Sequence, residues 1–160
     1  MDKDIIKGIE IVNTKLDHID DIIAIENLSF SIPWSKKTFW DELKNNEFAI
    51  YLSAKVEDKV VGYAGMWKIV DEGHITNIAV HPKYRQMGVG SKLLEALMKR
   101  ANTEGITKMT LEVRRNNKAA RHLYEKYGFT VYGIRKEYYA DNGEDALIMW
   151  CELPQKNNKE

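Results

Sequence analysis

The sequence predicts a single α/β domain, in which helices pack in layers on a sheet whose strands run in mixed directions. Segments with apolar residues at helical spacing alternate with short segments in which apolar and polar residues alternate as in strands. Along the chain these segments follow the order β-α-α-β-β-β-α-β-α-β-β. The length of 160 residues suits one domain, because a chain of this size can bury most of its apolar surface in one core.

Charge and cysteine usage exclude several classes of protein. Basic and acidic residues number 24 each, so the chain lacks the basic excess that general binders of nucleic acid or anionic membranes need. The single cysteine, Cys151, excludes an intramolecular disulfide and suits a reducing compartment. Residues 1–10 lack the apolar run of a signal peptide, and no segment approaches the roughly 20 apolar residues that span a bilayer. We therefore expect a cytoplasmic protein.

The N-terminal half is expected to form a strand, two helices and a hairpin. Pro33 interrupts the first helical pattern, and Ser35 predicts the N-cap of a second helix that reaches about Asn45. The polar pair Asp58-Lys59 suits a tight turn between two strands. The expected elements are a strand over 9–13, a helix carrying Ile19, Ile22, Ile23, Glu26 and Phe30, a helix over 35–45, and strands over 49–57 and 60–70.

The C-terminal half alternates strands with helices. A strand over 74–80 precedes an amphipathic helix that begins near residue 89 and that Gly105 stops. Asn116 or Asn117 caps the next helix, and Gly128 stands where a left-handed C-terminal cap needs glycine. The remaining expected elements are a strand around Met109, Leu111 and Val113, a helix bearing Ala120, Leu123, Tyr124 and Tyr127, strands over 130–138 and 145–153, and a polar tail over 155–160.

A glycine-bearing loop between a strand and a helix is the most informative segment. Gly88 and Gly90 remove side chains where backbone amides could approach a bulky anion, and the helix start adds unpaired N–H groups that favour a pyrophosphate. The loop is no Walker motif, because no Gly-Lys-Ser/Thr follows, and no Gly-x-Gly-x-x-Gly motif, because position 93 is leucine. A plain strand-to-helix turn remains the alternative.

Two further residues are candidates for proton transfer. Glu112 lies between Leu111 and Val113 in a predicted strand and faces away from them, so it could act as a general base. Its alternative is a solvated residue paired with Lys108 or Arg114. Tyr124 could give a proton to a leaving group, or it could be an ordinary core tyrosine of its helix.

The remaining aromatic, cysteine and histidine residues give weaker signals. Aromatic residues could line a substrate groove, although such residues usually pack in cores; they are Trp34, Phe39, Trp40, Tyr132, Tyr138 and Tyr139. Cys151 lies in an apolar strand-like stretch, which favours a buried inert thiol over an acyl-accepting nucleophile. The four histidines show no metal-ligand spacing, so no metal site is expected; they are His18, His74, His81 and His122.

Several of these segments match one family pattern when they are taken together. The matching residues are Ile78-Ala79-Val80-His81-Pro82, Tyr84-Arg85-Gln86-Met87-Gly88-Val89-Gly90, Leu111-Glu112-Val113-Arg114, Asn117, Ala120, Leu123-Tyr124-Glu125 and Gly128-Phe129. In this register they resemble the GCN5-related N-acetyltransferase (GNAT) family, whose signature is Gln/Arg-x-x-Gly-x-Gly/Ala. The resemblance runs from about Ile9 to Leu153. It implies a GNAT domain over 1–154, with a mixed, mostly antiparallel sheet flanked by helices and splayed central strands.

Other segments narrow the resemblance to the bacterial RimI-type subgroup. They are Ile32-Pro33-Trp34-Ser35, Asn77-Ile78-Ala79-Val80, Arg135-Lys136-Glu137-Tyr138-Tyr139 and Gly143-Glu144-Asp145-Ala146-Leu147-Ile148-Met149. That subgroup acetylates the N-terminal alanine of small-subunit ribosomal protein eighteen. Ile32 departs from the phenylalanine expected in many members, which leaves the chemistry untouched but could reshape the substrate entrance.

The resemblance also implies the roles of individual residues. Glu112 is expected to be the base and Tyr124 the acid, and Trp34, Tyr138 and Tyr139 are expected to flank the acceptor. Acetyl-CoA is the implied co-substrate, with no metal, no nucleic acid and no membrane. The residues expected to bind acetyl-CoA are Ile78, Ala79, Val80, Gln86, Met87, Gly88, Val89, Gly90, Ser91, Asn117 and Tyr124.

Two rival interpretations remain open at this point. A lysine or small-molecule acetyltransferase would share the glycine loop and differ around Trp34 and the tyrosine pair at 138–139. A non-catalytic CoA-binding module would keep both glycines but would not need Glu112 and Tyr124. For a protein N-terminus as acceptor, Glu125, Glu137 and Glu144 are candidates to attract a basic residue that follows the alanine.

Overall fold

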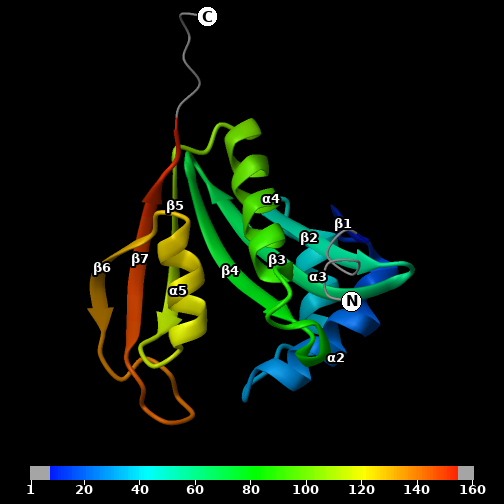
Figure 1. Ribbon diagram of the computed structural model, residues 1–160, viewed down its shortest axis with the longest axis horizontal. Coiled ribbons are helices and arrows are strands. Elements are labelled where there is room, and N and C mark those ends of the chain that lie inside the picture. The colour runs from blue at the N-terminus through cyan, green and yellow to red at the C-terminus, as the bar shows by residue number, and fades with distance from the viewer. Residues whose placement is uncertain (1–7, 155–160) are drawn as a thin grey trace, which may run out of the picture. The chain divides into compact units, whose positions relative to one another are not determined.

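The computed structural model describes residues 8–154, and its elements follow the predicted order (Figure 1). The N-terminal segment 1–7 and the expected tail at 155–160 lie outside the described residues. The elements are β1 (Ile9–Asn13), α2 (Ile19–Ser29), α3 (Lys36–Asn45), β2 (Ala49–Val56), β3 (Lys59–Ile69), β4 (Glu72–Val80), α4 (Val89–Thr103), β5 (Lys108–Arg114), α5 (Lys118–Lys126), β6 (Thr130–Arg135) and β7 (Ala146–Glu152), with short 3-10 turns at Leu16–His18 and Pro82–Tyr84.

Seven strands form one sheet in the order β1-β2-β3-β4-β5-β7-β6. β1 with β2, β2 with β3, β5 with β7, and β6 with β7 are antiparallel pairs. The parallel pair joins Glu72–His74 of β4 to Lys108–Thr110 of β5. The expectation of a mixed, mostly antiparallel sheet is therefore confirmed. None of the helices described within residues 8–154 is long and apolar enough to cross a membrane.

The described residues fall into two compact units. The first comprises residues 8–67 and 76–97, and the second comprises residues 68–75 and 98–154. β3, β4 and α4 each contribute residues to both units. Each unit is described separately below.

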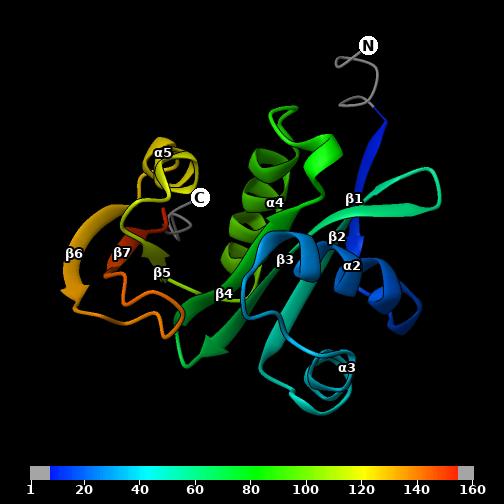
Figure 2. The same cartoon turned by 90° about the horizontal axis from the view of Figure 1, so that it is seen from below.

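In the first unit, α2 and α3 cover one face of the strands and the first part of α4 covers the other (Figure 2). Gly62 and Tyr63, which are consecutive on β3, face opposite sides of the sheet. A Cβ added at Gly62 would meet Val89 and Leu93 of α4 at 3.3 and 3.1 Å, so this helix approaches the sheet closely at a residue without a side chain. Tyr63 points the other way and packs on Phe39 of α3.

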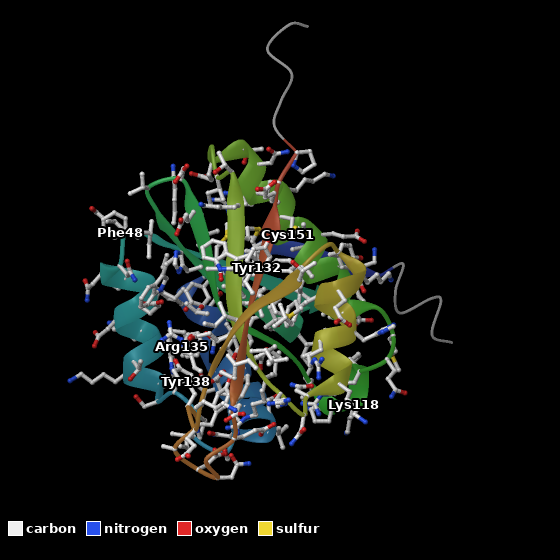
Figure 3. All side chains as sticks on the ribbon, turned by 90° about the vertical axis from the view of Figure 1, so that its left-hand side faces the viewer. Phe48, Lys118, Tyr132, Arg135, Tyr138 and Cys151 are labelled. Carbon is white, nitrogen blue, oxygen red and sulfur yellow. The ribbon has the colours of Figure 1, made fainter. Side chains whose placement is uncertain are left out.

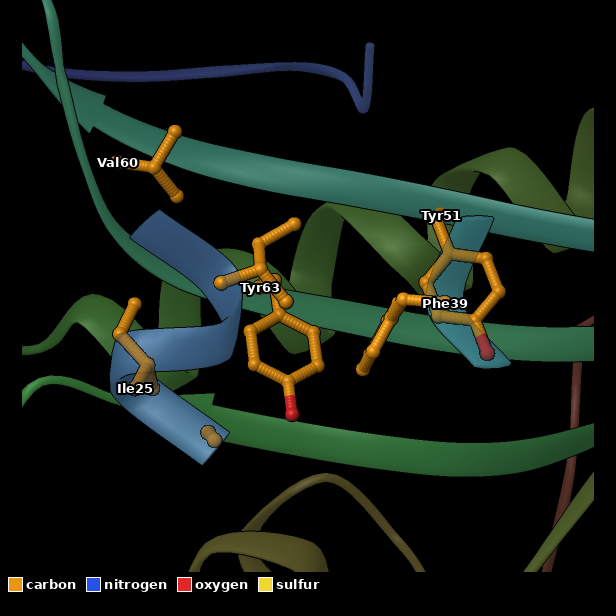
Figure 4. Close-up of a cluster of buried hydrophobic side chains, with 7 residues drawn as sticks. Ile25, Phe39, Tyr51, Val60 and Tyr63 are labelled. Atoms are coloured by element: carbon orange, nitrogen blue, oxygen red, sulfur yellow. The ribbon is translucent and has the colours of Figure 1, made fainter. Parts of the chain in front are cut away.

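Aromatic rings form the centre of the core under α2 and α3 (Figure 4). The Phe39 side chain is fully buried. Its ring centroid lies 5.0 Å from that of Trp34, 5.8 Å from that of Tyr51 and 5.6 Å from that of Tyr63. Burying a phenylalanine stabilises a fold by roughly 1.5–3 kcal/mol, so this ring is a principal reason why α3 lies on β2 and β3. For Phe39, packing rather than groove lining is the correct interpretation.

Local capping signals set the helix ends in this unit, with one difference from the prediction. The Ser35 hydroxyl accepts the N–H of Thr38 at 3.1 Å, as its predicted N-cap role requires. α2 ends at Ser29, however, and Phe30 has an extended backbone, so Phe30 does not continue the buried helical stripe.

The hairpin between β2 and β3 turns one residue earlier than predicted. Lys59 pairs with Val56, so Lys59 belongs to β3 rather than to the turn. Glu57 takes the left-handed backbone conformation, with φ of 56°, that the tight connection requires. The turn is therefore Glu57-Asp58.

In the second unit, α5 lies beside the strands β5, β7 and β6. Of the two candidate caps, Asn117 is the one that caps α5, by accepting the N–H of Ala120 at 3.1 Å. Gly128 ends the helix with φ of 95°, as predicted. Tyr124 packs on Phe129, with ring centroids 5.8 Å apart. The Cys151 thiol is free and buried, and burial raises its pKa, which confirms the interpretation as an inert thiol.

The last two strands are shorter than predicted. β6 ends at Arg135 and β7 begins at Ala146, where the sequence predicted strands over 130–138 and 145–153. Residues 136–145, called the β6–β7 loop below, leave the sheet because their side chains and main chain bond to charged groups instead of continuing the strand ladder.

We expect Gly65→Ala to lower the free energy of unfolding by about 1–3 kcal/mol, the usual cost of overpacking. Gly65 of β3 pairs with Tyr51 of β2, and an added Cβ would lie 2.2 Å from a carbon of the Tyr51 ring. Urea denaturation measures the change. Gly133→Ala is the matched control, because its Cβ would lie 3.5 Å from Ile148, an ordinary contact, and should leave the protein equally stable or more stable by up to about 1 kcal/mol. Wild-type stability of Gly65→Ala would contradict the packing of Tyr51 over β3.

Candidate active site

The predicted glycine loop lies in the first unit between the end of β4 and the start of α4. Two of its residues have left-handed backbones, Gln86 with φ of 63° and Gly88 with φ of 86°. Helix α4 begins at Val89, and its first backbone bond to this loop joins the N–H of Lys92 to the carbonyl of Gly88 at 3.1 Å. The N–H groups that open a helix have no acceptor within it, so those of residues 89–91 are suited to an anion. This geometry fits the pyrophosphate of CoA.

The end of β4 is tied to α2 by an arginine of the same loop. Arg85 donates from Nε to the carbonyl of Val80 at 2.9 Å and from Nη2 to the Ser29 hydroxyl at 3.0 Å. The N–H of His81 donates to the carbonyl of Val61 in β3 at 2.8 Å. The Val80 carbonyl is thus engaged by Arg85. An acetyl oxygen is itself an acceptor, so at this position it would require a main-chain N–H.

The side chains of β4 do not alternate strictly between the two faces of the sheet. The Thr76 hydroxyl lies 3.3 Å from that of Tyr51, whose ring packs on Phe39 of α3. The next residue, Asn77, donates to Glu26 of α2. Both neighbours thus reach the face that α2 and α3 cover, whereas successive residues of a regular strand point to opposite faces. This irregularity directly precedes Ile78, the first residue predicted to contact the acetyl donor.

In the second unit, Glu112 stands on β5 between buried residues and is itself partly exposed. Its Oε1 accepts a hydrogen bond from the Tyr138 hydroxyl at 3.2 Å, and its Oε2 forms an ion pair with Nε of Arg135. The pairing with Lys108 or Arg114 that the sequence suggested as an alternative is wrong. Lys108 instead pairs with Glu72 at 3.5 Å.

The strand order explains why Arg135 reaches Glu112. Glu112 pairs in register with Ile148 of β7, and Ile148 pairs with Gly133 of β6. Arg135 follows Gly133 by two residues and therefore shares its face of the sheet. Figure 3 shows Tyr132, Arg135 and Tyr138 following one another along β6 and into the β6–β7 loop.

Arg114, at the end of β5, fastens the β6–β7 loop. It pairs with Asp141 at 2.9 Å and with Glu144 at 3.3 Å, and its guanidinium lies 3.9 Å from the centroid of the Tyr139 ring. Glu144 also accepts the N–H of Asn116 at 2.8 Å, and this bond is the main reason why the pKa of Glu144 is lowered. The acidic side chains of this loop thus hold its conformation.

Burial alters the acidity of the candidate acid, Tyr124, and of the neighbouring Tyr139. Burial raises the pKa of Tyr124 well above its ordinary value, and the neighbouring Tyr139 phenol adds to the effect. Burial raises the pKa of Tyr139 to about 12, opposed by Arg114 and supported by Glu112. The rings of Tyr138 and Tyr139 meet edge to face at 5.1 Å. The second unit therefore gathers four predicted site residues, Glu112, Tyr124, Tyr138 and Tyr139.

The remaining predicted site residues have separate surroundings. Trp34 belongs to the first unit, where its ring packs on Phe39. Asn117 uses its side-chain oxygen to cap α5. Sequence reasoning missed Arg135 as the partner of Glu112, since no local pattern marks that pair. It placed Glu26 on the apolar stripe of its helix but gave this buried carboxylate no role. Within residues 8–154, no group of three or more histidine, cysteine, aspartate or glutamate side chains could hold a metal ion.

Comparisons with known proteins identify the family. The family profile described as "Acetyltransferase (GNAT) family" matches residues 19–129. The chain is 43% identical over 141 residues to the putative [ribosomal protein bS18]-alanine N-acetyltransferase of Bacillus subtilis, covering 88% of this chain and 93% of that protein. It is 40% identical over 129 residues to the [ribosomal protein bS18]-alanine N-acetyltransferase of Salmonella typhimurium, covering 78% and 84%.

A solved structure is similar over nearly the whole chain. The ribosomal-protein-S18-alanine N-acetyltransferase from Escherichia coli superposes with a TM-score of 0.85 at 32% identity, covering 95% of this chain and 98% of that one. Ard1 from Thermoplasma volcanium gives the same TM-score at 27% identity, covering 92% and 99%. The chain belongs to the GNAT family of acetyltransferases, and its fold is the GNAT fold.

We expect Gly90→Val to raise the Kd for acetyl-CoA about tenfold or more, the equivalent of one lost hydrogen bond to a charged group. The branched side chain would stand at the second residue of α4, where backbone N–H groups are expected to meet the pyrophosphate. Isothermal titration calorimetry measures the affinity. Ala96→Val, farther along the same helix, introduces the same branched side chain away from the loop and should bind acetyl-CoA normally. Unchanged affinity in folded Gly90→Val would refute the loop assignment.

Proposed function

We propose that this acetyltransferase transfers the acetyl group of acetyl-CoA to the α-amine of the N-terminal alanine of ribosomal protein bS18. One observation carries the proposal: relatives named for that activity are 37–43% identical to this chain over 78–88% of its length. The rival acceptor of a lysine side chain is an outcome of the competition experiment below.

The proposal assigns binding of the acetyl donor mainly to the first unit. The N–H groups of residues 86–91 bind the pyrophosphate, and main-chain groups of residues 78–80 bind the pantetheine arm and the acetyl carbonyl. The Val80 N–H stabilises the oxyanion that forms when the amine attacks the thioester. The left-handed Gly88 and the tie between Arg85 and Val80 support this assignment, since both preorganise the main chain before acetyl-CoA binds.

Glu112 is the proposed general base. An α-ammonium group has a pKa of roughly 7.7–8.0, so much of it is protonated at neutral pH and cannot attack. Glu112 accepts the proton, directly or through a water molecule. The acceptor ammonium carries the same charge as Arg135, so it can replace that guanidinium beside Oε2 while Tyr138 remains bonded to Oε1.

Tyr124 is the proposed general acid. Because burial raises its pKa, the phenol keeps its proton throughout the physiological pH range. The protonated phenol donates a hydrogen bond to the sulfur as the carbon–sulfur bond breaks and negative charge develops there, and it is the proton source for the departing thiolate.

The acceptor-binding groups suit an extended peptide. Tyr138 is 48% exposed and offers its ring for packing, because its hydroxyl is directed to Glu112. Of the three glutamates predicted to attract a basic second residue, Glu144 is already neutralised by Arg114, whereas Glu125 and Glu137 are exposed. Glu137 lies next to Tyr138 and is the better placed for that attraction.

We expect Glu112→Gln to lower kcat by roughly 10²–10⁴, the range for loss of one general catalyst, with little change in acetyl-CoA affinity. Part of the activity should return at higher pH, where the amine loses its proton unaided. Tyr124→Phe should also lower kcat, because the thiolate would leave without a proton donor. Steady-state kinetics with calorimetry measures both effects. Tyr132→Phe, an exposed phenol on β6, is the matched control, and wild-type rates in both test variants would refute the mechanism.

We expect a peptide beginning Ala-Arg with a free α-amine to be acetylated in preference to two competitors. One competitor is the same peptide with a blocked amine, and the other offers an internal lysine alone. Lysine has a pKa near 10.4, so its deprotonation costs about 3 kcal/mol more than that of an α-amine. Mass spectrometry of the mixture identifies the product. Preferred acetylation of lysine would overturn the N-terminal assignment and leave the acetyltransferase activity standing.

A further inference from the structure

We propose that Glu26 is a positioning residue for acetyl transfer, because its carboxylate joins the loop that carries Trp34 to the strand that leads to the cofactor loop. The inference rests on the proposed function, in which Trp34 flanks the acceptor and residues 78–80 bind the acetyl donor. In this role Glu26 touches neither substrate. It fixes the distance between the two segments that do.

The contacts of Glu26 join two segments that are distant in sequence. Its side chain lies in the core beside Ile22 and Ile25, and the residue is 1% exposed. Oε1 accepts the main-chain N–H of Trp34 at 3.0 Å. Oε2 accepts the side-chain N–H of Asn77, 51 residues along the chain, at 3.4 Å. One buried carboxylate therefore connects α2, the α2–α3 loop (residues 30–35) and β4.

Trp34 is consequently held at two points. Its main-chain N–H is bonded to Glu26, and its ring packs on Phe39 with centroids 5.0 Å apart. The ring contact places the side chain, whereas the carboxylate places the backbone of the loop. If the acceptor oxygen were removed, this N–H would lose its bond, and the loop would have to move to find another partner.

Asn77 transmits the same constraint to β4. It directly precedes Ile78, at the step where the strand departs from regular alternation. Its Oδ1 is buried and has no hydrogen-bond partner among residues 8–154, and the same holds for the Tyr63 hydroxyl. Figure 4 shows that this hydroxyl points toward β4. The network thus has unused hydrogen-bonding capacity beside Asn77, and position 26 need not be charged to satisfy it.

This unused hydrogen-bonding capacity allows variants that separate the loss of the charge at position 26 from the loss of its hydrogen bonds. In Glu26→Gln, the amide oxygen can accept from Trp34 and the amide nitrogen can donate to Oδ1 of Asn77 after a half-turn of the Asn77 amide. Glu26→Met removes both acceptors at similar volume. Asn77→Asp places a second carboxylate against Glu26, and the double variant E26Q/N77D restores a donor–acceptor pair.

We expect Glu26→Met and Asn77→Asp each to raise the KM for the Ala-Arg peptide about tenfold, with a Kd for acetyl-CoA within about threefold of wild type. Glu26→Gln and E26Q/N77D should keep a peptide KM within about threefold of wild type. Asp20→Asn is the matched control, since it removes an exposed carboxylate on α2 that pairs with Lys36, and it should leave KM unchanged.

Two results would overturn the inference. The first is a wild-type peptide KM in folded Glu26→Met, which would make the contact merely structural. The second is a failure of E26Q/N77D to recover the KM lost in Asn77→Asp. If Glu26→Met does not fold, the comparison of Asn77→Asp with the double variant decides alone, because each keeps polar groups at both positions.

Amide hydrogen exchange tests the role of Glu26 independently of the proposed function, because it requires no catalytic activity. Glu26→Met should speed amide hydrogen exchange at Trp34, while exchange at Thr38, whose N–H is bonded to Ser35, stays unchanged. If the wild-type protein acetylated no α-amine, the proposed function would fall, and this exchange experiment would still test the tie. Equal exchange at Trp34 in both proteins would refute the tie itself.

Discussion

Phe39 contacts three aromatic rings that come from a loop and two strands, and the position of α3 depends on this packing. One helical turn later, Glu42 accepts the Tyr51 hydroxyl at 2.8 Å and also bonds the indole N–H of Trp67. The helix is thus held to the strands by apolar burial and by one carboxylate on the same side. Because α3 begins directly after the α2–α3 loop, this packing also fixes where that loop ends.

The second unit holds its candidate site in a different way. The β6–β7 loop leaves the sheet and is stabilised by Arg114, whose two acidic partners are partly exposed and whose stacked tyrosine is half-buried. Exposed ion pairs contribute little individually, typically about 0.2–1 kcal/mol, and gain more when several share one centre. A loop held in this way can adjust at little cost. In the proposed mechanism, that property suits the exchange of Arg135 for an acceptor ammonium beside Glu112.

Sequence reasoning succeeded where the determining interactions are local. Ser35 caps its helix as predicted, Asn117 is the one of its two candidate caps that does so, and Gly128 ends its helix, because each acts within one turn of its position. Sequence reasoning failed to identify side-chain contacts that depend on the order of the strands in the sheet. Tyr138 lies 26 residues from Glu112 and meets it only because β6 and β7 follow β5 in the sheet. Thr110 shares the face of Glu112 on β5, yet it is buried and its hydroxyl donates to the Met149 carbonyl, a contact that also depends on the pairing of β5 with β7.

The buried carboxylate of Glu26 lowers the stability of the fold at neutral pH, so its presence requires a compensating role. Burial raises its pKa, and the hydrogen bonds from Trp34 and Asn77 offset part of that rise. A carboxyl whose folded pKa exceeds its unfolded value, near ~4.3, contributes most to stability below that value and progressively less as the pH rises through the folded pKa. At neutral pH the ionised group therefore costs stability. An apolar side chain would avoid this cost, but it could not accept N–H groups from two distant segments at once. The tie between the Trp34 loop and β4 is thus the physical gain that a carboxylate at this position provides.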